Sequence, residues 1–359
     1  MYNECTSCFL NSCMEQYNFT VRVSCITFNH APYIVDTMNG ICMQQTSFPF
    51  VCTIFDDCST DGEQEVIKQY VKENFDLDDS SVARNEETDD YVLCFARHKT
   101  NHNCFFAVYY LKYNHHRVRK GFRKNDYCKE FIDQVPYIAL CEGDDFWIYP
   151  LKLQMQVNYM ENHPDCGMVY TQVDLYNQEQ GIYRKGWAAQ TDFEDLLLNS
   201  NKIITLATCF RRDLYDDFHA EVVADKSWKM GDFPLWLYIS HRSSLKYFDE
   251  ITGVYRLLPT SASHNPDIKK MRDFLVSTYE VRCFFAQKYG REDLLDTFAI
   301  NEVNNLFRLS VQKDKNISGF IYRFAKSHGV VSINTLVKCL LYSTKVGRRF
   351  HRKKYPSEW

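Results

Sequence analysis

The sequence contains no uninterrupted run of about 18 apolar residues, the length that a membrane-spanning helix needs. Its N-terminus has no basic region followed by an apolar core, which is the pattern of a secretory signal. Positive charge is not in excess either, because 42 basic residues face 46 acidic ones and leave a net charge of −4. We therefore expect a chain that does not span a membrane, is not secreted and has no nucleic-acid partner.

Regular cysteine spacing is also lacking. The 15 cysteines are odd in number, and many lie inside apolar runs, where a thiol behaves as a small buried hydrophobic group. Cys5, Cys8 and Cys13 are close together, but no second Cys/His pair stands at the spacing of a zinc finger, so we do not predict a zinc site there. This cysteine usage is typical of a protein in a reducing cytoplasm.

Apolar side chains, in contrast, make up 45% of the 359 residues, which is enough for a large core. Strand-like and helix-like segments alternate in the first half, which predicts parallel strands joined by right-handed crossovers. The predicted strands are 21–26, 50–55, 91–96, 137–141 and 166–170, and the predicted helices are 32–44, 61–74, 150–162, 192–199 and one that starts at 231. We expect a surface loop at 76–90, a polar insert rich in His, Arg and Lys at 98–136, and mostly helices after 266.

Carboxylates gather at the ends of two predicted strands. The apolar run 137–141 stops at Glu142, Asp144 and Asp145, and the run 50–55 stops at Asp56 and Asp57. Like charges raise one another's pKa and repel unless a cation lies among them. Because strand ends of an open α/β sheet meet at one crevice, these acids predict a shared site for a hard divalent cation, Mn²⁺ or Mg²⁺, which prefers oxygen ligands.

Four ordered segments carry a family resemblance. They are Val23-Ser-Cys-Ile-Thr-Phe-Asn-His30, Phe55-Asp-Asp-Cys-Ser-Thr-Asp-Gly62, Tyr137 to Trp147 with 151–157, and Gly231-Asp-Phe-Pro-Leu-Trp236 with 254–256 and 261–263. Together they resemble motifs of the family 2 glycosyltransferases of the GT-A fold, especially bacterial enzymes that build capsule, lipopolysaccharide and other surface polysaccharides. The resemblance implies an α/β fold with a mixed, mainly parallel Rossmann-like sheet flanked by helices, and the later residues add a helical C-terminal appendage.

The resemblance also implies a division of the chain. Residues 1–19 would be an N-terminal extension, and 20–265 the glycosyltransferase domain. Within that domain, 20–150 would be the half that binds the nucleotide-sugar donor, and 151–265 the half that holds the acceptor and the catalytic base. Residues 266–359 would be a helical region with a basic tail.

By matched position, Asp232 would be the general base and Asp144 the principal metal ligand, with Glu142 and Asp145 helping. Phosphate or acceptor contacts would come from Arg117 and Lys120, cations of the polar insert, and from Arg256. Nucleotide-binding residues would be Thr27, Phe28, Asn29, Asp56, Asp57 and Asp144. The sequence departs from the family pattern at four positions: Glu142 replaces an Asp, Cys58 a Gly, Gly231 an acid and Leu258 a His. The last change leaves a third protein ligand to the metal open.

The implied reaction moves a sugar, with inversion, from a nucleotide diphosphate sugar, with UDP favoured, to a hydroxyl of a glycan or a lipid-linked oligosaccharide. Two other functions stay open, a non-catalytic nucleotide-sugar-binding protein and a sugar-phosphate nucleotidyltransferase. Structural explanations also stay open: Asp61 is better explained as a helix cap, Asp232 equally well as an acid at a helix N-terminus, and the cations of 98–136 as a solvated insert.

The last open point is the basic tail. Residues 345–355 carry Lys, Arg and aromatic side chains and follow the apolar run 336–342. Two interpretations remain, a solvated tail or a peripheral contact with anionic lipid. The expected location is accordingly the cytoplasm, with the inner face of the cytoplasmic membrane as the alternative.

Overall fold

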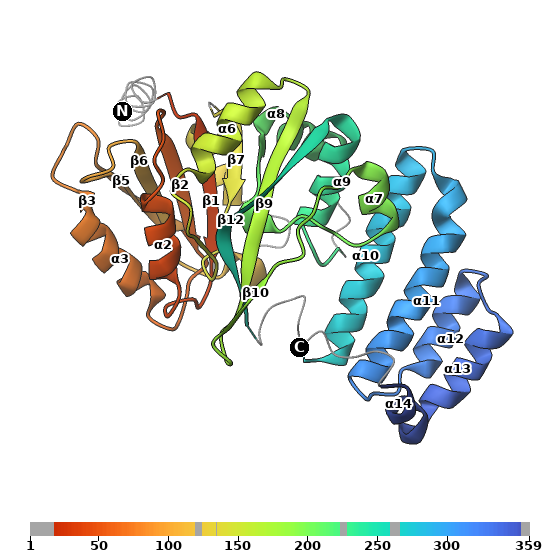
Figure 1. The fold of residues 1–359 in the computed structure, drawn as a ribbon. Helices are drawn as coiled ribbons and strands as arrows, with labels where there is room; N and C mark the ends of the chain where they lie inside the picture. Colours follow the sequence, from red (N-terminus) through yellow and green to blue (C-terminus); the bar gives the residue numbers. More distant parts are fainter. Residues whose placement is uncertain (1–17, 119–123, 134, 223–227, 259–265, 353–359) are drawn as a thin grey trace. The chain divides into compact units, whose positions relative to one another are not determined.

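The computed structural model describes residues 18–118, 124–133, 135–222, 228–258 and 266–352 (Figure 1). The chain divides into two compact units. The sheet unit holds residues up to 192 together with 201–222 and 239–256, and the helical unit holds 193–200, 223–238 and everything after 256. The predicted boundary at 265 differs from this division, because two segments from the middle of the chain belong to the helical unit. The predicted extension 1–19, with Cys5, Cys8 and Cys13, lies almost wholly outside the described residues.

The centre of the sheet is four parallel strands in the order β6-β2-β1-β7. Their bounds are Cys104–Leu111 for β6, Phe50–Asp56 for β2, Val21–Thr27 for β1 and Tyr137–Leu140 for β7. Helix α2, Ile34–Cys42, connects β1 to β2, and α3, Glu63–Asn74, follows β2. β2 is buried at every residue, which explains its almost continuous apolar run, whereas β1 is mostly buried but also carries the polar residues Arg22, Ser24 and Thr27. The predicted strand-helix-strand-helix pattern of the first half is confirmed.

Antiparallel strands extend both sides of this centre. On the β6 side lie β5, Tyr91–His98, then β3, Phe75–Asp76, and β4, Arg84–Glu87. On the β7 side lie β11, Cys209–Arg211, β9, Cys166–Asn177, β10, Ile182–Lys185, β12, Ser244–Leu257, and β8, Phe146–Trp147. The helices of this unit, besides α2 and α3, are α4, His115–Val118, α5, Lys129–Ile132, α6, Lys152–Asn162, and α8, Arg212–Glu221. The predicted class, a mixed sheet flanked by helices, is confirmed.

Two predictions in the first half were wrong. The polar insert 98–136 contains β6, a strand whose every residue is buried and which pairs in parallel with β2. The predicted surface loop 76–90 contains β4, which pairs with β5. The cations on both sides of β6 give this part of the chain a polar composition. The eight apolar residues of β6 are nevertheless typical of a strand covered on both faces.

A glycine sets the distance between α2 and β8. A Cβ on Gly40 would lie 2.6 Å from the carbonyl oxygen of Trp147 and 2.7 Å from its nitrogen. Because both atoms belong to the backbone, a larger side chain would push the helix and the strand apart. Gly40 therefore fixes α2 against the segment that directly follows the predicted acid cluster.

The helical unit contains helices that fill the predicted C-terminal appendage, as Figure 1 shows in blue. They are α10, Ile268–Lys288, α11, Leu295–Gln312, α12, Ser318–Ser327, α13, Ile333–Ser343, and α14, Lys345–His351, joined in this unit by α7, Phe193–Leu198, and by the first part of α9, Asp232–Arg242. Among the described residues no helix is both long and apolar enough to cross a bilayer.

A buried carboxyl group of α11 makes the stability of this unit depend on pH. Glu302 is 4% exposed, and burial raises its pKa to about 7 against weaker opposing effects of Asn305 and Arg282. Within the described residues its Oε1 has no hydrogen-bond partner. The folded state favours the protonated acid. The free energy of unfolding is therefore highest below the ordinary pKa of 4.5 and falls as the pH rises towards 7.

We predict that Glu302→Gln removes this dependence. At pH 8 the variant should be more stable than the native chain, by up to about 3 kcal/mol, and the difference should vanish near pH 4.5. Urea unfolding at several pH values measures the free energy of unfolding. Glu292→Gln, at an exposed position, is the matched control and should not change the pH dependence. A constant difference between Glu302→Gln and the native chain at every pH would contradict the prediction.

Candidate active site at the carboxyl edge of the parallel strands

The direction of chain connection reverses beside β1. From β1 the chain passes to β2 and then to β6 on one side, and it returns to β7 on the other side. In such open α/β sheets the connecting loops diverge at the reversal and leave a crevice at the carboxyl ends of the strands. The register places Thr27 opposite Asp56, so the ends of β1 and β2 lie level with each other.

The acid turn after β7, Glu142 to Asp145, continues the pairing with β1. The Cys141 nitrogen donates to the Ser24 carbonyl oxygen and the Gly143 nitrogen to the Ile26 carbonyl oxygen, each at 3.1 Å. A Cβ on Gly143 would lie only 2.1 Å from the Thr27 hydroxyl oxygen. The glycine therefore allows the acid turn to lie directly against the end of β1.

Arg256 and Thr37 hold the acid turn from the other side. The Arg256 backbone nitrogen donates to Asp145 Oδ1 at 2.8 Å, and its Nη1 donates to the Asp144 carbonyl oxygen at 2.8 Å. The same guanidinium pairs with Asp36 and lies 4.6 Å from the Phe146 ring centroid. Thr37 Oγ1 donates to the Asp145 carbonyl oxygen at 2.6 Å. Arg256 is 5% exposed, so its guanidinium acts within the protein, where it binds the acid turn and Asp36.

The three carboxylates of the acid turn have different surroundings. Asp145 is 2% exposed, and burial raises its pKa well above the ordinary range, with Asp144 and Glu142 adding to the effect. Glu142 and Asp144 are partly exposed. Asp144 Oδ2 lies 3.9 Å from Nε2 of His30, which follows β1. Asp145 therefore belongs to the support of the turn, while Asp144 faces the end of the neighbouring strand.

The carboxylates of the acid turn are the predicted ligands of Mn²⁺ or Mg²⁺. In the described part of the chain, no three His, Cys, Asp or Glu side chains are grouped so that they could hold a metal ion by themselves. Magnesium-type cations, however, are often held by one or two carboxylates together with waters and substrate phosphates. Glu142 and Asp144, both partly exposed oxygen donors, fit such a partial site but not a complete protein cage.

The two aspartates after β2 differ from each other. Asp57 accepts the backbone N–H groups of His115 at 2.8 Å and His116 at 3.3 Å, and its Oδ2 lies 3.1 Å from Lys124 Nζ. It therefore holds the segment that follows β6. Asp56 Oδ1 accepts Gln64 Nε2 at 2.6 Å, but its buried Oδ2 has no partner among the described residues. A buried acceptor without a donor is costly, so it suggests a missing ligand.

Glu63, which the sequence analysis did not select, ties the loops after β1 and β2 together. It is fully buried at the first position of α3 and accepts three hydrogen bonds. The donors are Thr27 Oγ1, the His30 nitrogen at 2.9 Å and Ser59 Oγ at 2.7 Å. Burial raises the pKa of Glu63, and the hydrogen bonds oppose this effect. The sequence signal was an acid at a helix start, which is usually explained by the helix dipole alone.

Two residues of these loops have left-handed backbone conformations. Asn29 has a φ of 58° and Cys58 a φ of 61°. Asn tolerates this region, and the Asn29 side chain also accepts the Thr60 backbone N–H at 2.8 Å. Cys58 adopts a φ at which glycine has no steric cost, so its side chain is disfavoured there. Asp61 accepts the backbone N–H groups of Ala31 and Glu63, but the N-cap position of α3 is Gly62, so Asp61 lies one residue before the cap.

The predicted cationic residues have different surroundings in the structure. Arg117 is exposed, and its guanidinium carbon lies 5.7 Å from the ring centroid of Phe28, at the end of β1. His115 is buried and donates its backbone N–H to Asp57. Lys120 lies outside the described residues. Arg117 is thus the one of the three predicted phosphate or acceptor contacts that the structure describes as exposed near the loops of the candidate site.

Asp232 belongs to the helical unit. It is the first residue of α9 and is partly exposed, whereas the next seven residues are buried. This position agrees with the helix N-terminal explanation and leaves the role as a base a prediction.

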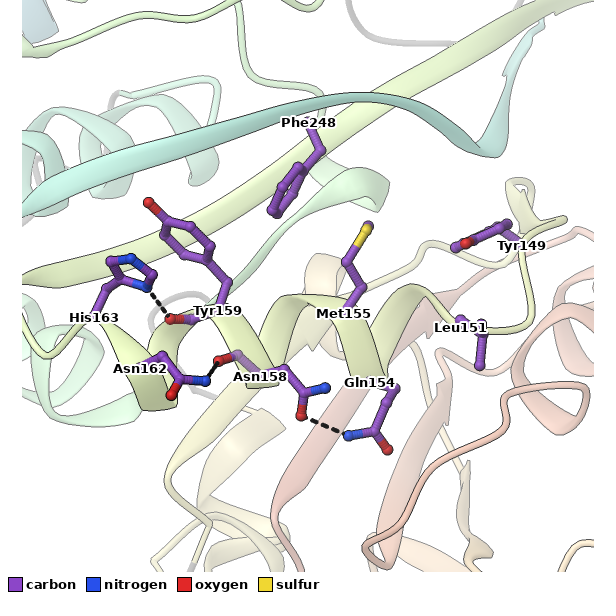
Figure 2. A pocket seen from close by; sticks show the side chains of 9 residues that line it. All are labelled: Tyr149, Leu151, Gln154, Met155, Asn158, Tyr159, Asn162, His163 and Phe248. Atoms are coloured by element: carbon purple, nitrogen blue, oxygen red, sulfur yellow. Dashed lines mark hydrogen bonds between the residues drawn. The ribbon is translucent and has the colours of Figure 1, made fainter.

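Two grooves of the sheet unit lie elsewhere. One, of about 460 Å³, runs along α6 and is lined by Met155, Tyr159, His163 and, from β12, Phe248 (Figure 2). Another, of about 540 Å³, lies between the end of α2 and the loop that contains Thr100. Neither groove is lined by a carboxylate or by a predicted site residue. The candidate site is therefore defined by the acids at the strand ends and not by cavity volume.

The fold and these acids define the class as an open α/β protein with a carboxylate site at the reversal of strand order. No protein-family model matches the chain. Curated relatives include uncharacterized proteins of Mycobacterium tuberculosis (Rv1520, strain H37Rv) and Mycobacterium bovis (Mb1547). Each is 30% identical over 211 residues, which cover 55% of this chain and 49% of the relative. The chain thus spans about half the length of the curated relatives that it matches.

Solved structures give more specific neighbours. S. aureus TarS in complex with UDP-GlcNAc aligns with a TM-score of 0.49 and 12% identity, covering 94% of this chain and 92% of the other. The mannosyltransferase PcManGT from Pyrobaculum calidifontis, in complex with GDP-Man and Mn²⁺, aligns with a TM-score of 0.44 and 10% identity, covering 93% and 86%. Because both TM-scores lie below 0.5, these likenesses by themselves assign neither a substrate nor a mechanism to this chain.

We predict that Glu63→Ala destabilises the protein by about 3 kcal/mol, because three donors, one of them the buried Thr27 hydroxyl, lose their acceptor. Chemical denaturation measures the free energy of unfolding. Glu65→Ala, an exposed position on the same helix, is the control and should change stability by less than about 0.5 kcal/mol. Similar losses in the two variants would show that Glu63 does not tie the loops together.

We predict that Cys58→Gly stabilises the protein by about 1 kcal/mol, because glycine adopts a positive φ without steric cost. Cys58→Ala keeps the Cβ and removes only the thiol, so it should not produce this gain. Thermal and chemical unfolding of both variants measure the difference. Equal stability of the glycine and alanine variants would contradict the strain at this position.

Proposed function

We propose that this chain is a glycosyltransferase that uses a nucleotide diphosphate sugar as donor. The observation that carries the proposal is the meeting of two features at one reversal of strand order. One is the buried, unpartnered Oδ2 of Asp56 within the described residues, and the other is the partly exposed pair Glu142 and Asp144. An acceptor for a base and a carboxylate pair for a diphosphate-bound cation are the two requirements of such a donor.

In the proposed complex, Asp56 binds the base of the nucleotide. Its free oxygen is covered in this structure, so donor binding includes a small shift of the loops after β2 and β6. Thr27 and Asn29 shape the end of β1, and Phe28 offers a half-buried ring beside Arg117. Asp57 and Glu63 act as positioning residues, because their oxygens are already used to hold these loops.

Glu142 and Asp144 would hold the divalent cation, and Asp145 and Arg256 would position them. When bound, Mn²⁺ or Mg²⁺ supplies Lewis-acid stabilisation for the negative charge that develops on the leaving diphosphate. Among the described cations, Arg117, which lies beside Phe28, is the one that we propose to neutralise further phosphate charge.

The proposed reaction is a single displacement. The oxygen of the acceptor hydroxyl forms a bond to C1 of the sugar while the bond from C1 to the diphosphate oxygen breaks, and the configuration at C1 is inverted. The hydroxyl proton passes to a carboxylate, for which we propose Asp232, and the nucleoside diphosphate leaves. The finer proposals are UDP as the nucleotide and a glycan or lipid-linked glycan of a bacterial surface polysaccharide as the acceptor, with the reaction in the cytoplasm or at the inner face of its membrane.

We predict that Asp232→Asn lowers turnover by about 10² to 10⁴ and leaves donor affinity unchanged, because a general base acts only in the chemical step. Release of nucleoside diphosphate is measured with UDP-, GDP- and dTDP-sugars and a set of glycan acceptors, in Mn²⁺ and in EDTA. Asp56→Asn should instead weaken donor binding, measured by calorimetry.

Asp213→Asn is the matched control. Asp213 is an exposed acid in the first turn of α8, so this change removes the same charge from a helix N-terminus without a proposed role in the reaction. Native turnover in Asp232→Asn would remove Asp232 from the mechanism. Donor binding without release for every acceptor would favour the binding protein, and release of pyrophosphate from a nucleoside triphosphate and a sugar phosphate would favour the nucleotidyltransferase.

A further inference from the structure

Helix α13 has one face inside the helical unit and one apolar face outside it. It packs on α11 and α12 through a side that includes Thr335 and Tyr342, which are 6% and 2% exposed. The opposite side recurs at three- and four-residue intervals, as one stripe of a helix does. We call this stripe, with two side chains of α14, the α13–α14 apolar face. It consists of Ile333, Leu336, Val337, Leu340, Leu341, Val346 and Phe350, all exposed.

The exposure of this face is large. Ile333 is 83% exposed, Leu340 74% and Phe350 80%. Single exposed apolar residues are common on protein surfaces. Several along one side of a helix indicate a surface that binds a membrane or another molecule.

The charge around the α13–α14 apolar face has one sign. From Lys315 to Ser357 the sequence contains ten Lys and Arg residues and no Asp or Glu. Lys345, Arg349 and Arg352 are exposed on α14 and directly after it. Among the described residues, Asp314 faces these cations: it pairs with Arg348 at 3.0 Å and lies 3.7 Å from Arg349. Lys345 also interacts electrostatically with Asp314, but the exposed cations Lys345, Arg349 and Arg352 outnumber this one acid and can attract an external anion.

We propose that the α13–α14 apolar face is a docking surface for an anionic lipid bilayer, on which it lies at the level of the headgroups. An amphipathic helix buries its apolar side at this boundary while its cations attract anionic headgroups. Neither signal alone gives firm attachment, and here both occur on neighbouring helices. At 11 residues α13 is much too short to span the bilayer, so it lies on the surface.

A second copy of this chain is a poorer occupant. A two-fold contact would place the same cation-rich surface of each copy against itself, and like charges at an interface repel. An anionic membrane complements both the apolar and the charged part of the surface. The inference does not depend on the proposed function, because none of its residues belongs to the candidate active site.

The test is co-sedimentation of the full chain with vesicles of phosphatidylcholine, alone or with about a third phosphatidylglycerol. We expect binding only to the anionic vesicles and weakening by salt. The triple variant Lys345→Gln/Arg349→Gln/Arg352→Gln should lose at least about tenfold in partitioning, because each cation near the surface contributes about 1 kcal/mol. Ile333→Ser/Leu340→Ser/Phe350→Ser should lose about as much.

The control Lys68→Gln/Lys72→Gln/Lys129→Gln removes three exposed charges from the sheet unit and should bind vesicles as the native chain does. Circular dichroism checks that each variant is folded. Absence of binding to anionic vesicles would overturn the proposal, and so would native binding by the serine variant, because the apolar face would then not be inserted. A dimer that the serine variant abolishes, without vesicle binding, would assign the face to a second copy.

Discussion

The parallel pairing of β1 with β2 on one side and β7 on the other is the constraint on which the candidate site depends. Side-chain direction and loop position at the carboxyl edge follow from this register, because Thr27 lies opposite Asp56 and the turn after β7 continues along β1 to Gly143. A shift of one residue in either pair would turn the strand-end side chains to the other face of the sheet. The close approach of Gly143 to Thr27 makes such a shift sterically difficult in this region.

The acids at the strand ends form two groups. One group holds the neighbouring segments by hydrogen bonds, and the other can bind a ligand. Asp57, Glu63 and Asp145 are buried, and their oxygens accept hydrogen bonds from neighbouring loops. These bonds satisfy the charges and fix the backbone around the crevice, as buried carboxylates require. Asp56 and Asp144, next to them in sequence, keep an unpartnered oxygen within the described residues or a partly exposed carboxylate. Adjacent acids therefore have different roles. The proposed donor site is based on Asp56 and Asp144.

The sequence predicted three of the four parallel central strands, β1, β2 and β7, because each contains an apolar segment, and it predicted the helices after β1 and β2, which have an apolar side. It failed where composition around a strand was misleading. β6 is completely buried, yet it was assigned to a polar insert because of the cations on both sides of it. The strands β8 and β3 have two residues each, and such short pairs depend on contacts across the sheet that no local pattern reveals. The division into two units, with 193–200 and 223–238 in the helical unit, was likewise invisible in the sequence.

By itself the sequence determined that carboxylates stand at the ends of two buried strands, since an apolar run followed by acids is a local property. It also determined that the residues after 266 are mostly helical and that 345–355 is rich in cations. Only the tertiary structure decided which acids are satisfied internally, because the partners of Glu63 and Asp145 come from segments up to 111 residues away. Only the structure, too, separated the covered side of α13 from its exposed apolar side, because helix packing decides which stripe of an apolar helix is buried.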